Sequence, residues 1–422
     1  MIPLLIYAGI FIAAFMLVRA IAGGMARTGF SSLKTVTFGD ESAVLPDRRA
    51  SIISILTLFF LWGSFTGSII VPSFLHMPGP YLGQATFDYT VETEDGQTDD
   101  ATVTYLVHPA GEDVEPPEVD PGEGFAVNDS LVITAYRSEL ARLDRNDLIG
   151  RDEGARIVAV DGQPIEPGGR VDTDRARVTM STRGSLNITP DQGWQMEPIW
   201  LPPPEDVFDR LIEIMTDGFR NFTLWEHLGY SLFRVVVGFA LGALIGIPLG
   251  YAMGLSNWFR GWFDPIVEFM RPVPPLALIP LVIIWAGIGE SGKIILLFLA
   301  ALWIMAIAAR SGVSGVNISK VHAAYSLGSS KPQILRHVII PNSLPEIFTG
   351  ARVAMGVCWG TVVAAELVAA EQGAGMMIMV ASRFQNTDIV ILGIIMIGVI
   401  GFGIDMLMRW GERVLVPWKG RS

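Results

Sequence analysis

The chain has 422 residues, of which 50% are hydrophobic and 17% are charged, and its formal net charge is −12 at pH 7. A soluble globular protein of this length carries more charge on its surface, so the composition excludes an ordinary soluble protein. Several apolar runs of about twenty residues are long enough to cross the hydrocarbon layer of a membrane. We therefore predict a polytopic membrane protein.

The first apolar run extends from Ile2 to Val18. One interpretation is a signal peptide, because a small-x-small pattern follows at Ala20 and Ala22. However, no positive charge precedes the run, whereas Arg19 follows it, which is the reverse of a signal peptide. We expect an uncleaved transmembrane anchor with its N-terminus outside the membrane.

Residues 19–50 contain five Lys or Arg residues, Arg27 and Lys34 among them, and the positive-inside rule places such a segment in the cytoplasm. Residues 1–50 are therefore interpreted as an extra transmembrane helix with a cytoplasmic linker. The next apolar run leads outward as the first transmembrane helix of the core, within 51–77. This orientation would place the segment that follows, 78–200, in the periplasm.

Residues 78–200 contain 24 Asp or Glu but only nine Arg and no Lys, a net charge of −15, whereas the rest of the chain has a net charge of +3. This pattern predicts one acidic soluble domain inserted into a slightly basic membrane protein. Short alternating or β-branched runs at 101–107, 130–136 and 155–160 predict strands. The insert is therefore expected to be a small β-rich domain, with a Pro- and acid-rich loop at 112–124.

The stretch ARIVAVDGQPI at 155–165 resembles the strand-turn segment of PDZ-type domains. The alternative is an unrelated small β domain. We expect the insert to contact a protein partner or to regulate access to the membrane-spanning part, because its negative charge would repel an anionic ligand. An insert without either role is the third interpretation.

Five further apolar runs have the length of transmembrane helices. They cover about 225–253, 264–287, 293–313, 347–370 and 388–409. Seven crossings from an outside N-terminus leave the C-terminus in the cytoplasm, in agreement with the nearby Arg413, Lys419 and Arg421. The single cysteine, Cys358, lies in one of these runs, so the chain cannot form an intrachain disulfide.

The run at 225–253 carries a glycine at every fourth position. These glycines are Gly238, Gly242, Gly246, Gly250 and, just beyond the run, Gly254. On a helix they form one strip that lets another helix backbone approach closely, so we predict tight helix packing along it. Pro272, Pro274 and Pro275 interrupt the next run, and such breaks occur in a membrane only where protein or a water-filled cavity covers the freed backbone groups.

The connection at 314–346 is polar, mainly basic and longer than two spans need. Its sequence HAAYSLGSSKPQILRHVIIPNSLP, residues 322–345, predicts two short helical pieces separated at Gly328, the second of which ends at Pro341 and Pro345. We interpret the connection as a docking surface for a cytoplasmic partner.

This segment resembles the cytoplasmic signature of the permease subunits of ABC importers, which reads EAA, three residues, Gly, nine residues and I-x-L-P. The residues that match at the same spacing are Ala323, Ala324, Gly328 and Pro341. Val338 and Ile340 replace the isoleucine and the leucine of the signature, and His322 replaces its glutamate. The segments LPPPEDVF (201–208), 271–294 and 362–378 are similar to the nitrate, sulfonate and taurine branch of this family.

The resemblance covers about 51–76 and 200–418. It implies a type I importer permease core at 201–422, an all-α polytopic membrane fold of about seven transmembrane helices, into which the β-rich domain is inserted. It also implies a multi-pass protein of the bacterial inner membrane that is not an enzyme. The expected solute is taurine or another sulfonate, and nitrate, bicarbonate or a heteroaromatic precursor are the alternatives.

The same resemblance implies the partners. They are a second copy of the chain, two ATP-binding-cassette ATPase subunits and a periplasmic solute-binding protein; no nucleic acid is expected. ATP and magnesium would be bound by the ATPases, and this chain would bind no cofactor or metal. The role of coupling helix is carried over to His322, Ala323, Ala324, Gly328 and Pro341.

Charged residues within apolar runs are costly in a membrane and therefore informative. Glu366 lies deepest, and it is interpreted either as a pore-lining or gate residue or as the partner of a buried arginine. Arg234, Glu268, Arg271 and Asp405 lie nearer the ends of their runs, where we expect their side chains to reach the interface.

Two other function classes are considered. A membrane-anchored periplasmic sensor or protease-associated protein would use the insert as a PDZ-like module, but no catalytic nucleophile is recognisable. If the chain were a secondary transporter, the docking surface predicted at 314–346 would have no function. The stretch 287–294 matches G-x-x-x-x-G-K, yet Ile294 stands where a nucleotide site needs Ser or Thr. The five histidines show no metal-binding spacing.

Overall fold

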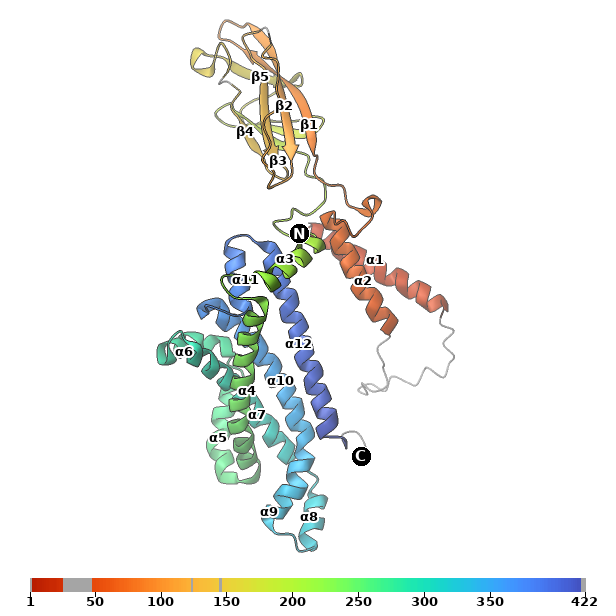
Figure 1. Cartoon of the computed structure of the whole chain (residues 1–422), viewed down its shortest axis with the longest axis vertical. Coiled ribbons are helices and arrows are strands. Elements are labelled where there is room, and N and C mark those ends of the chain that lie inside the picture. Colours follow the sequence, from red (N-terminus) through yellow and green to blue (C-terminus); the bar gives the residue numbers. More distant parts are fainter. Residues whose placement is uncertain (1, 26–47, 123, 144–145, 419–422) are drawn as a thin grey trace. The chain divides into compact units, whose positions relative to one another are not determined.

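The computed structural model describes residues 2–25, 48–122, 124–143 and 146–418 (Figure 1). It divides into two compact units, Met1–Glu205 and Asp206–Ser422, which are described separately below. The predicted cytoplasmic linker around Arg27 and Lys34 lies outside the described residues, as do the C-terminal Lys419 and Arg421.

The first unit begins with two helices, α1 (Ile2–Met25) and α2 (Arg48–Thr66). The second helix ends at Thr66 because Gly67 adopts a positive φ of 67°, and the Ser68 N–H donates to the carbonyl of Gly63 over 3.0 Å. This bond and the left-handed glycine are the features of a Schellman helix end. The helix therefore ends well before the end of the range 51–77 that was predicted to contain it.

Nine strands follow among the described residues, and they form two sheets. Their bounds are β1 (Gly83–Glu92), β2 (Thr98–His108), β3 (Asp129–Thr134), β4 (Glu139–Ala141), β5 (Arg156–Val160), β6 (Gln163–Pro164), β7 (Arg170–Asp172), β8 (Ala176–Met180) and β9 (Leu186–Pro190). The strand order is β3-β2-β1-β5-β6 in one sheet and β4-β9-β8-β7 in the other. The described part of residues 83–190 is thus β-rich, and the three predicted strand runs form most of β2, β3 and β5.

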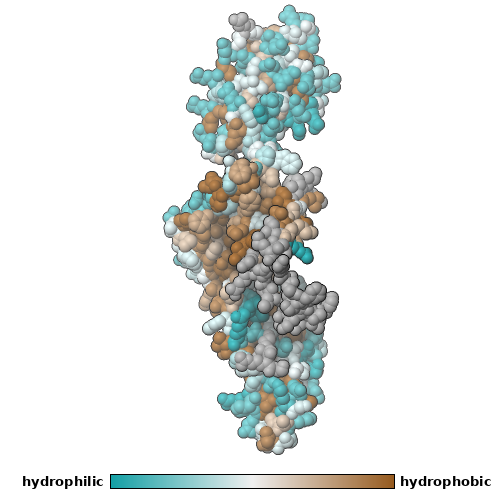
Figure 2. Space-filling model, turned by 90° about the vertical axis from the view of Figure 1, so that its right-hand side faces the viewer, coloured by the Kyte–Doolittle hydropathy of each residue, from teal (hydrophilic) through white to brown (hydrophobic). Residues whose placement is uncertain are grey.

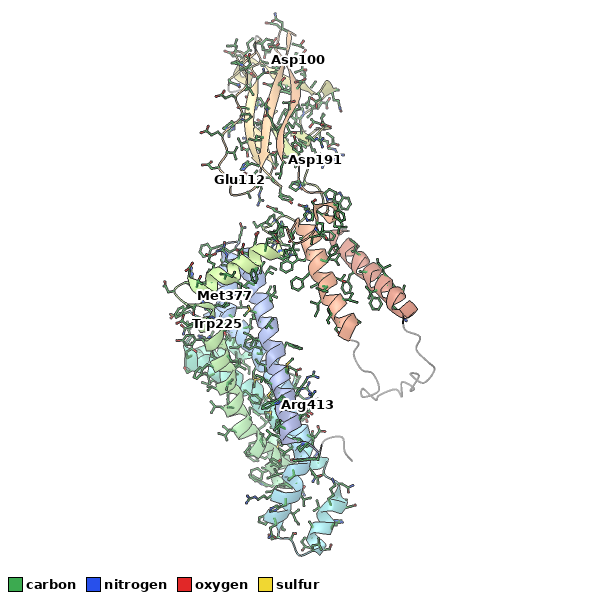
Figure 3. The ribbon with its side chains drawn as sticks, turned by 45° about the vertical axis from the view of Figure 1, so that its right-hand side comes forward. Asp100, Glu112, Asp191, Trp225, Met377 and Arg413 are labelled. Atoms are coloured by element: carbon green, nitrogen blue, oxygen red, sulfur yellow. The ribbon has the colours of Figure 1, made fainter. Side chains whose placement is uncertain are left out.

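Alternating side chains of the strands build the core of this β-rich region. Phe87, Tyr89 and Val91 on β1 are buried together with Val103 and Tyr105 on β2, and residues of the second sheet complete the same cluster. The period of two places these side chains on one face of the sheet. Acidic side chains such as Asp100, Glu112 and Asp191 are exposed on the outside (Figure 3).

The predicted loop at 112–124 lies within the connection from β2 to β3. These two strands are the only parallel pair among the strand pairs described, since the register aligns Val103 with Asp129 and His108 with Thr134. A parallel pair needs a long crossover, and the Pro- and acid-rich segment provides it. The stretch 155–165, by contrast, forms β5, a tight turn and β6, so its resemblance to PDZ-type domains is that of one hairpin.

The second unit is helical. Its elements are α3 (Pro204–Thr216), α4 (Leu224–Leu255), α5 (Asn257–Met270), the 3-10 turn η6 (Pro275–Leu278), α6 (Ile279–Ala286), α7 (Glu290–Ser314), α8 (Ile318–Ser326), α9 (Lys331–Ile334), the π-helical turn η7 (Leu335–Ile339), α10 (Ile340–Ala369), α11 (Ala374–Arg383) and α12 (Thr387–Leu415). Figure 2 shows a broad hydrophobic area in the helical part of the chain. Large apolar side chains such as Leu244 and Phe402 are exposed in this unit.

Four described helical segments are long and apolar enough to cross a membrane, and a bent pair would make a fifth if it counts as one span. The four are α4, α7, the segment Lys331–Leu367 and α12. Crossings by α1 and α2, which would complete the predicted seven, stay a prediction. This membrane-spanning fold of four to five apolar helices is what the structure supports.

The predicted interruption of the run at 264–287 by its prolines is confirmed. The chain forms α5 and then, after a break, η6 and α6, and the two halves are bent by 94°. The first half ends at Met270 because Pro272, Pro274 and Pro275 cannot donate backbone hydrogen bonds.

The prediction that Pro341 and Pro345 end a helix was wrong. The segment Lys331–Leu367 continues through both prolines and is one apolar helical span. Pro341 lies in the first turn of α10, immediately after the π-helical turn η7. A π turn bonds residue i to i+5, so it accommodates a position that cannot donate to the carbonyl four residues earlier.

Candidate coupling loop and buried charge network

The connection between α7 and α10 contains the short helix α8. Hydrogen bonds at each of its two ends stabilise this helix. The Asn317 side chain accepts a hydrogen bond from the Ser319 N–H over 2.9 Å at the start. At the end, Gly328 has a φ of +84°, and the Ser329 N–H donates to the Ala324 carbonyl over 3.1 Å. A left-handed residue favours glycine, so the glycine of the motif is required by the turn that follows α8.

The surface of α8 is exposed and partly apolar. Tyr325 and Leu327 have relative exposures of 68% and 86%, and Ile318 has 61%. The basic Lys320 and Lys331 lie beside them in the sequence and are also exposed. Exposed apolar side chains next to charges are typical of a surface that docks another protein.

The structure brings together only part of the predicted coupling residues. His322 and Ala323 are exposed on α8, Ala324 is half-buried there, and Gly328 follows directly. Pro341 lies elsewhere, in α10. A hydrogen bond of 2.7 Å from Lys320 Nζ to Asn342 Oδ1 joins α8 to α10.

A buried charge network connects α4, α7 and α10. The Arg234 side chain is fully buried and donates to Glu366 Oε1 over 2.6 Å through Nη1. Its Nε and Nη2 donate to the two carboxylate oxygens of Glu290 over 2.6 and 2.7 Å. Because a buried charge without a partner is strongly destabilising, this arginine holds three helices in one arrangement.

The expectation that the Arg234 side chain reaches the membrane interface was therefore wrong, because this side chain is 0% exposed. For Glu366, the structure favours the second of the two interpretations. This residue is 1% exposed, and its carboxylate also accepts from Ser231 Oγ over 2.8 Å and from the Gly375 N–H over 2.9 Å. Within this chain its carboxylate is thus part of a buried ion pair, and a pore-lining role of Glu366 stays a prediction.

The other three charged residues of the apolar runs, Glu268, Arg271 and Asp405, are more accessible to solvent than Arg234 and Glu366. Arg271 has a side chain that is 66% exposed. Glu268 accepts from Arg310 over 2.7 Å, and Asp405 accepts from Arg409 over 2.7 Å. These contacts are compatible with the predicted position near the ends of the spans.

Sequence reasoning missed Glu290, Ser231 and His227 in this network. His227 Nδ1 accepts from the Gly373 N–H over 3.1 Å, which fixes the start of α11. A signal was available, because positions 227, 231, 234 and 238 recur at the helical spacing of three and four residues. The polar residues continue the glycine strip of α4 toward its N-terminus.

The glycine strip faces α7, which lies beside α4 (Figure 1). A Cβ atom added at Gly242 would lie 2.5 Å from Ala301 Cβ, and one at Gly246 would lie 2.6 Å from the Leu302 carbonyl oxygen. Added Cβ atoms at Gly238 and Gly250 would also approach α7, to 2.4 Å in both cases. Only glycine lets the two backbones come this close.

Residues 242–415 match the family described as "Binding-protein-dependent transport system inner membrane component". This match covers most of the helical unit, including α7, α8 and α10. It does not include the β-rich region.

Three relatives are informative. The taurine transport system permease protein TauC of Escherichia coli K12 is 47% identical over 251 residues, 58% of this chain and 91% of the relative. The putative aliphatic sulfonates transport permease protein SsuC of the same organism is 38% identical over 227 residues, 54% of this chain and 84% of the relative. The bicarbonate transport system permease protein CmpB of Synechococcus elongatus is 33% identical over 197 residues, 46% of this chain and 70% of the relative.

Proposed function

Because the chain belongs to the family of binding-protein-dependent transport system inner membrane components, we propose that it is the permease subunit through which an ABC importer moves taurine or another sulfonate. The observation that carries this proposal is the 47% identity to a taurine permease over 91% of that protein. The family is confirmed, and with it the expectation of a multi-pass membrane permease rather than an enzyme.

The proposed partners are a second copy of this chain, two ATPase subunits and a solute-binding protein. The exposed apolar face of α8 supports the docking of an ATPase there, since Tyr325 and Leu327 lack cover in the described chain. ATP and magnesium would be held by that ATPase. This chain itself is proposed to bind neither.

The proposed transmission of force follows from the connections of α8. The bond between Lys320 and Asn342 ties α8 to α10, and the helical path from Lys331 to Leu367 leads directly into the membrane. Glu366 on this path is tied to Arg234 of α4. A displacement of α8 by the ATPase would therefore move α10 and α4 together, as a rigid body.

The proposed orientation places α8 in the cytoplasm and residues 78–200 in the periplasm. The basic residues around α8 support the first assignment through the positive-inside rule. The acidic exterior of the β-rich region supports a role in docking the binding protein, which is the preferred role of this insert. Bicarbonate is a second candidate solute, favoured by the 33% identity to a bicarbonate permease.

The coupling proposal is tested by the substitution Gly328→Asp, which adds a side chain and a charge to the left-handed turn after α8. Taurine uptake into vesicles that also contain the ATPase and the binding protein should fall to background, while membrane insertion is unchanged. Gly328→Asn is the matched variant, because asparagine has the same size, carries no charge and tolerates a positive φ. It should retain more uptake than Gly328→Asp. Normal uptake by Gly328→Asp would contradict the role of α8.

A further inference from the structure

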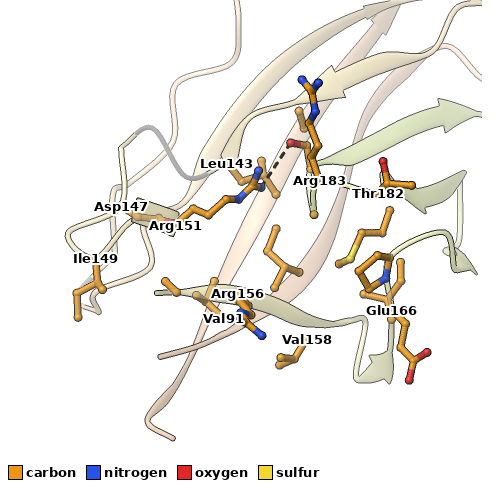
Figure 4. A pocket seen from close by; sticks show the side chains of 18 residues that line it. Val91, Leu143, Asp147, Ile149, Arg151, Arg156, Val158, Glu166, Thr182 and Arg183 are labelled. Atoms are coloured by element: carbon orange, nitrogen blue, oxygen red, sulfur yellow. Dashed lines mark hydrogen bonds between the residues drawn. The ribbon is translucent and has the colours of Figure 1, made fainter. Parts of the chain in front are cut away.

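The β-rich region of the first unit contains a cavity of about 410 Å³. We call it the inter-sheet pocket. One wall comes from β1 and β5 of the five-stranded sheet, and the opposite wall comes from β8 and the turn before β9 of the four-stranded sheet (Figure 4). The segment before β5 closes one side. The volume is that of a small-molecule binding site rather than of a packing defect.

The inner surface of the inter-sheet pocket is apolar. The residues that form it are Val91, Ala141, Leu143, Ala155, Ile157, Val158, Ile165 and Met180. Val91, Leu143 and Met180 are nearly completely buried and belong to the core of the β-rich region. The floor is therefore held by the core of the fold, and a ligand would find it already formed.

The rim of the inter-sheet pocket is basic, although the surrounding domain is acidic. Among the residues that the structure describes, three arginines line it, Arg151, Arg156 and Arg183, and two acidic residues, Asp147 and Glu166. Of these two, Glu166 directs its carboxylate away from the other lining side chains (Figure 4). The described lining of the pocket is thus basic, whereas residues 78–200 as a whole are acidic.

One of the arginines spans the mouth of the pocket. Arg151 Nη2 donates to Ser185 Oγ over 3.4 Å, from the segment before β5 to the turn between β8 and β9 (Figure 4). Gly184 in that turn has a φ of +80°, and a Cβ added there would lie 3.6 Å from Arg151 Nη2. The left-handed turn therefore brings its backbone close to the guanidinium, which offers five N–H donors and can serve several acceptors at once.

We propose that the inter-sheet pocket binds a small organic anion with an apolar body, a carboxylate or a sulfonate. The apolar body contacts the floor, and the anionic group accepts charge-assisted hydrogen bonds from the guanidinium groups of the rim. The net charge of −15 does not prevent this, because exposed charges more than about 10 Å away are screened at 0.1 M salt, whereas the arginines act at contact. The site lies entirely within the β-rich region and is independent of the transport function proposed above.

The test uses the full chain in lipid nanodiscs, without the ATPase or the binding protein, and isothermal titration calorimetry. The probes are hexane-1-sulfonate and hexanoate, which distinguish the two anionic groups, with hexan-1-ol and hexylamine as uncharged and cationic controls. At least one anion should bind roughly ten-fold more tightly than both controls, and its affinity should fall as salt is raised.

Variants locate the binding site. Arg151→Ala and Arg156→Ala should each weaken binding of the anion by roughly ten-fold. Arg170→Ala is the matched control, since Arg170 lies on β7 outside the pocket and its loss changes the net charge equally. Val158→Trp should fill the floor and abolish binding. The proposal is overturned if neither anion binds, if hexan-1-ol binds equally well, or if Arg170→Ala weakens binding as much as the rim variants. Binding of short peptides alone would also overturn it.

Discussion

The β-rich region and the helical unit of this chain are built on opposite principles. The β-rich region buries large side chains such as Tyr105, Leu186 and Ile188 and exposes acidic ones. The helical unit buries glycine, alanine and the Arg234–Glu366 ion pair, and it exposes large apolar side chains such as Leu244. One region has the interior expected in water, and the other has the interior expected in a membrane.

The difference follows from the solvent of each region. In water, removing apolar surface is the dominant favourable contribution, so large apolar side chains gather in the core. Among lipid tails that contribution is lost, and helices are instead held by close backbone packing and by polar contacts. The glycine strip of α4 and the charge network around Arg234 supply these two contributions in the helical unit.

The largest expected effect comes from breaking the ion pair. Arg234→Met leaves the Glu366 carboxylate buried without its cation, which should destabilise the helical unit by roughly 3–5 kcal/mol. Thermal unfolding of the detergent-solubilised chain measures this. Arg271→Met is the matched control, because it removes an arginine that is 66% exposed, and it should change the melting temperature little.

A second variant separates charge pairing from the loss of a side chain. Arg234→Met combined with Glu366→Gln removes both members of the buried pair, so most of the stability should return. If the double variant is as unstable as Arg234→Met, the network stabilises the unit through shape alone, and the contrast with the β-rich region weakens.

An intermediate effect is expected at the glycine strip. Gly246→Ala places a methyl group 2.6 Å from the Leu302 carbonyl oxygen, so α4 and α7 must move apart, at a cost of about 1–3 kcal/mol. Gly229→Ala lies on the same helix with no atom within 4 Å of the added Cβ, and it should be neutral or stabilising by up to about 1 kcal/mol. Equal effects of the two variants in thermal unfolding would show that close approach is not what the strip provides.

The smallest expected effect concerns the hydrophobic core of the β-rich region. Burial raises the pKa of Tyr105 from its usual 10 to about 12. Above pH 10 the unfolded chain loses this proton while the folded chain retains it, so the stability of the β-rich region should decrease between pH 10 and 12. In a tyrosinate absorbance titration, the difference between the parent chain and Tyr105→Phe should appear near pH 12. A difference near pH 10 would mean that the residue is accessible to water.

Many of the helices and strands could be predicted because short stretches of sequence determine them. The positions of α4, α7 and α12 follow from apolar runs, and those of β2, β3 and β5 follow from alternating ones. The family follows from a motif within a few tens of residues, and Gly328 could be assigned to a turn from its neighbours alone. Each of these features depends on residues close in the chain.

The sequence by itself thus determined the membrane class, the family, the acidic insert and the close-packing strip of α4. Only the tertiary structure decided that Arg234 is buried between Glu290 and Glu366, which are 56 and 132 positions away. It also decided that the helical segment Lys331–Leu367 continues through Pro341, and that three arginines of an acidic region meet at one pocket. Composition and periodicity indicate which face of a segment is exposed to water or lipid. The partner of a buried charge, however, depends on which distant segments the fold brings together.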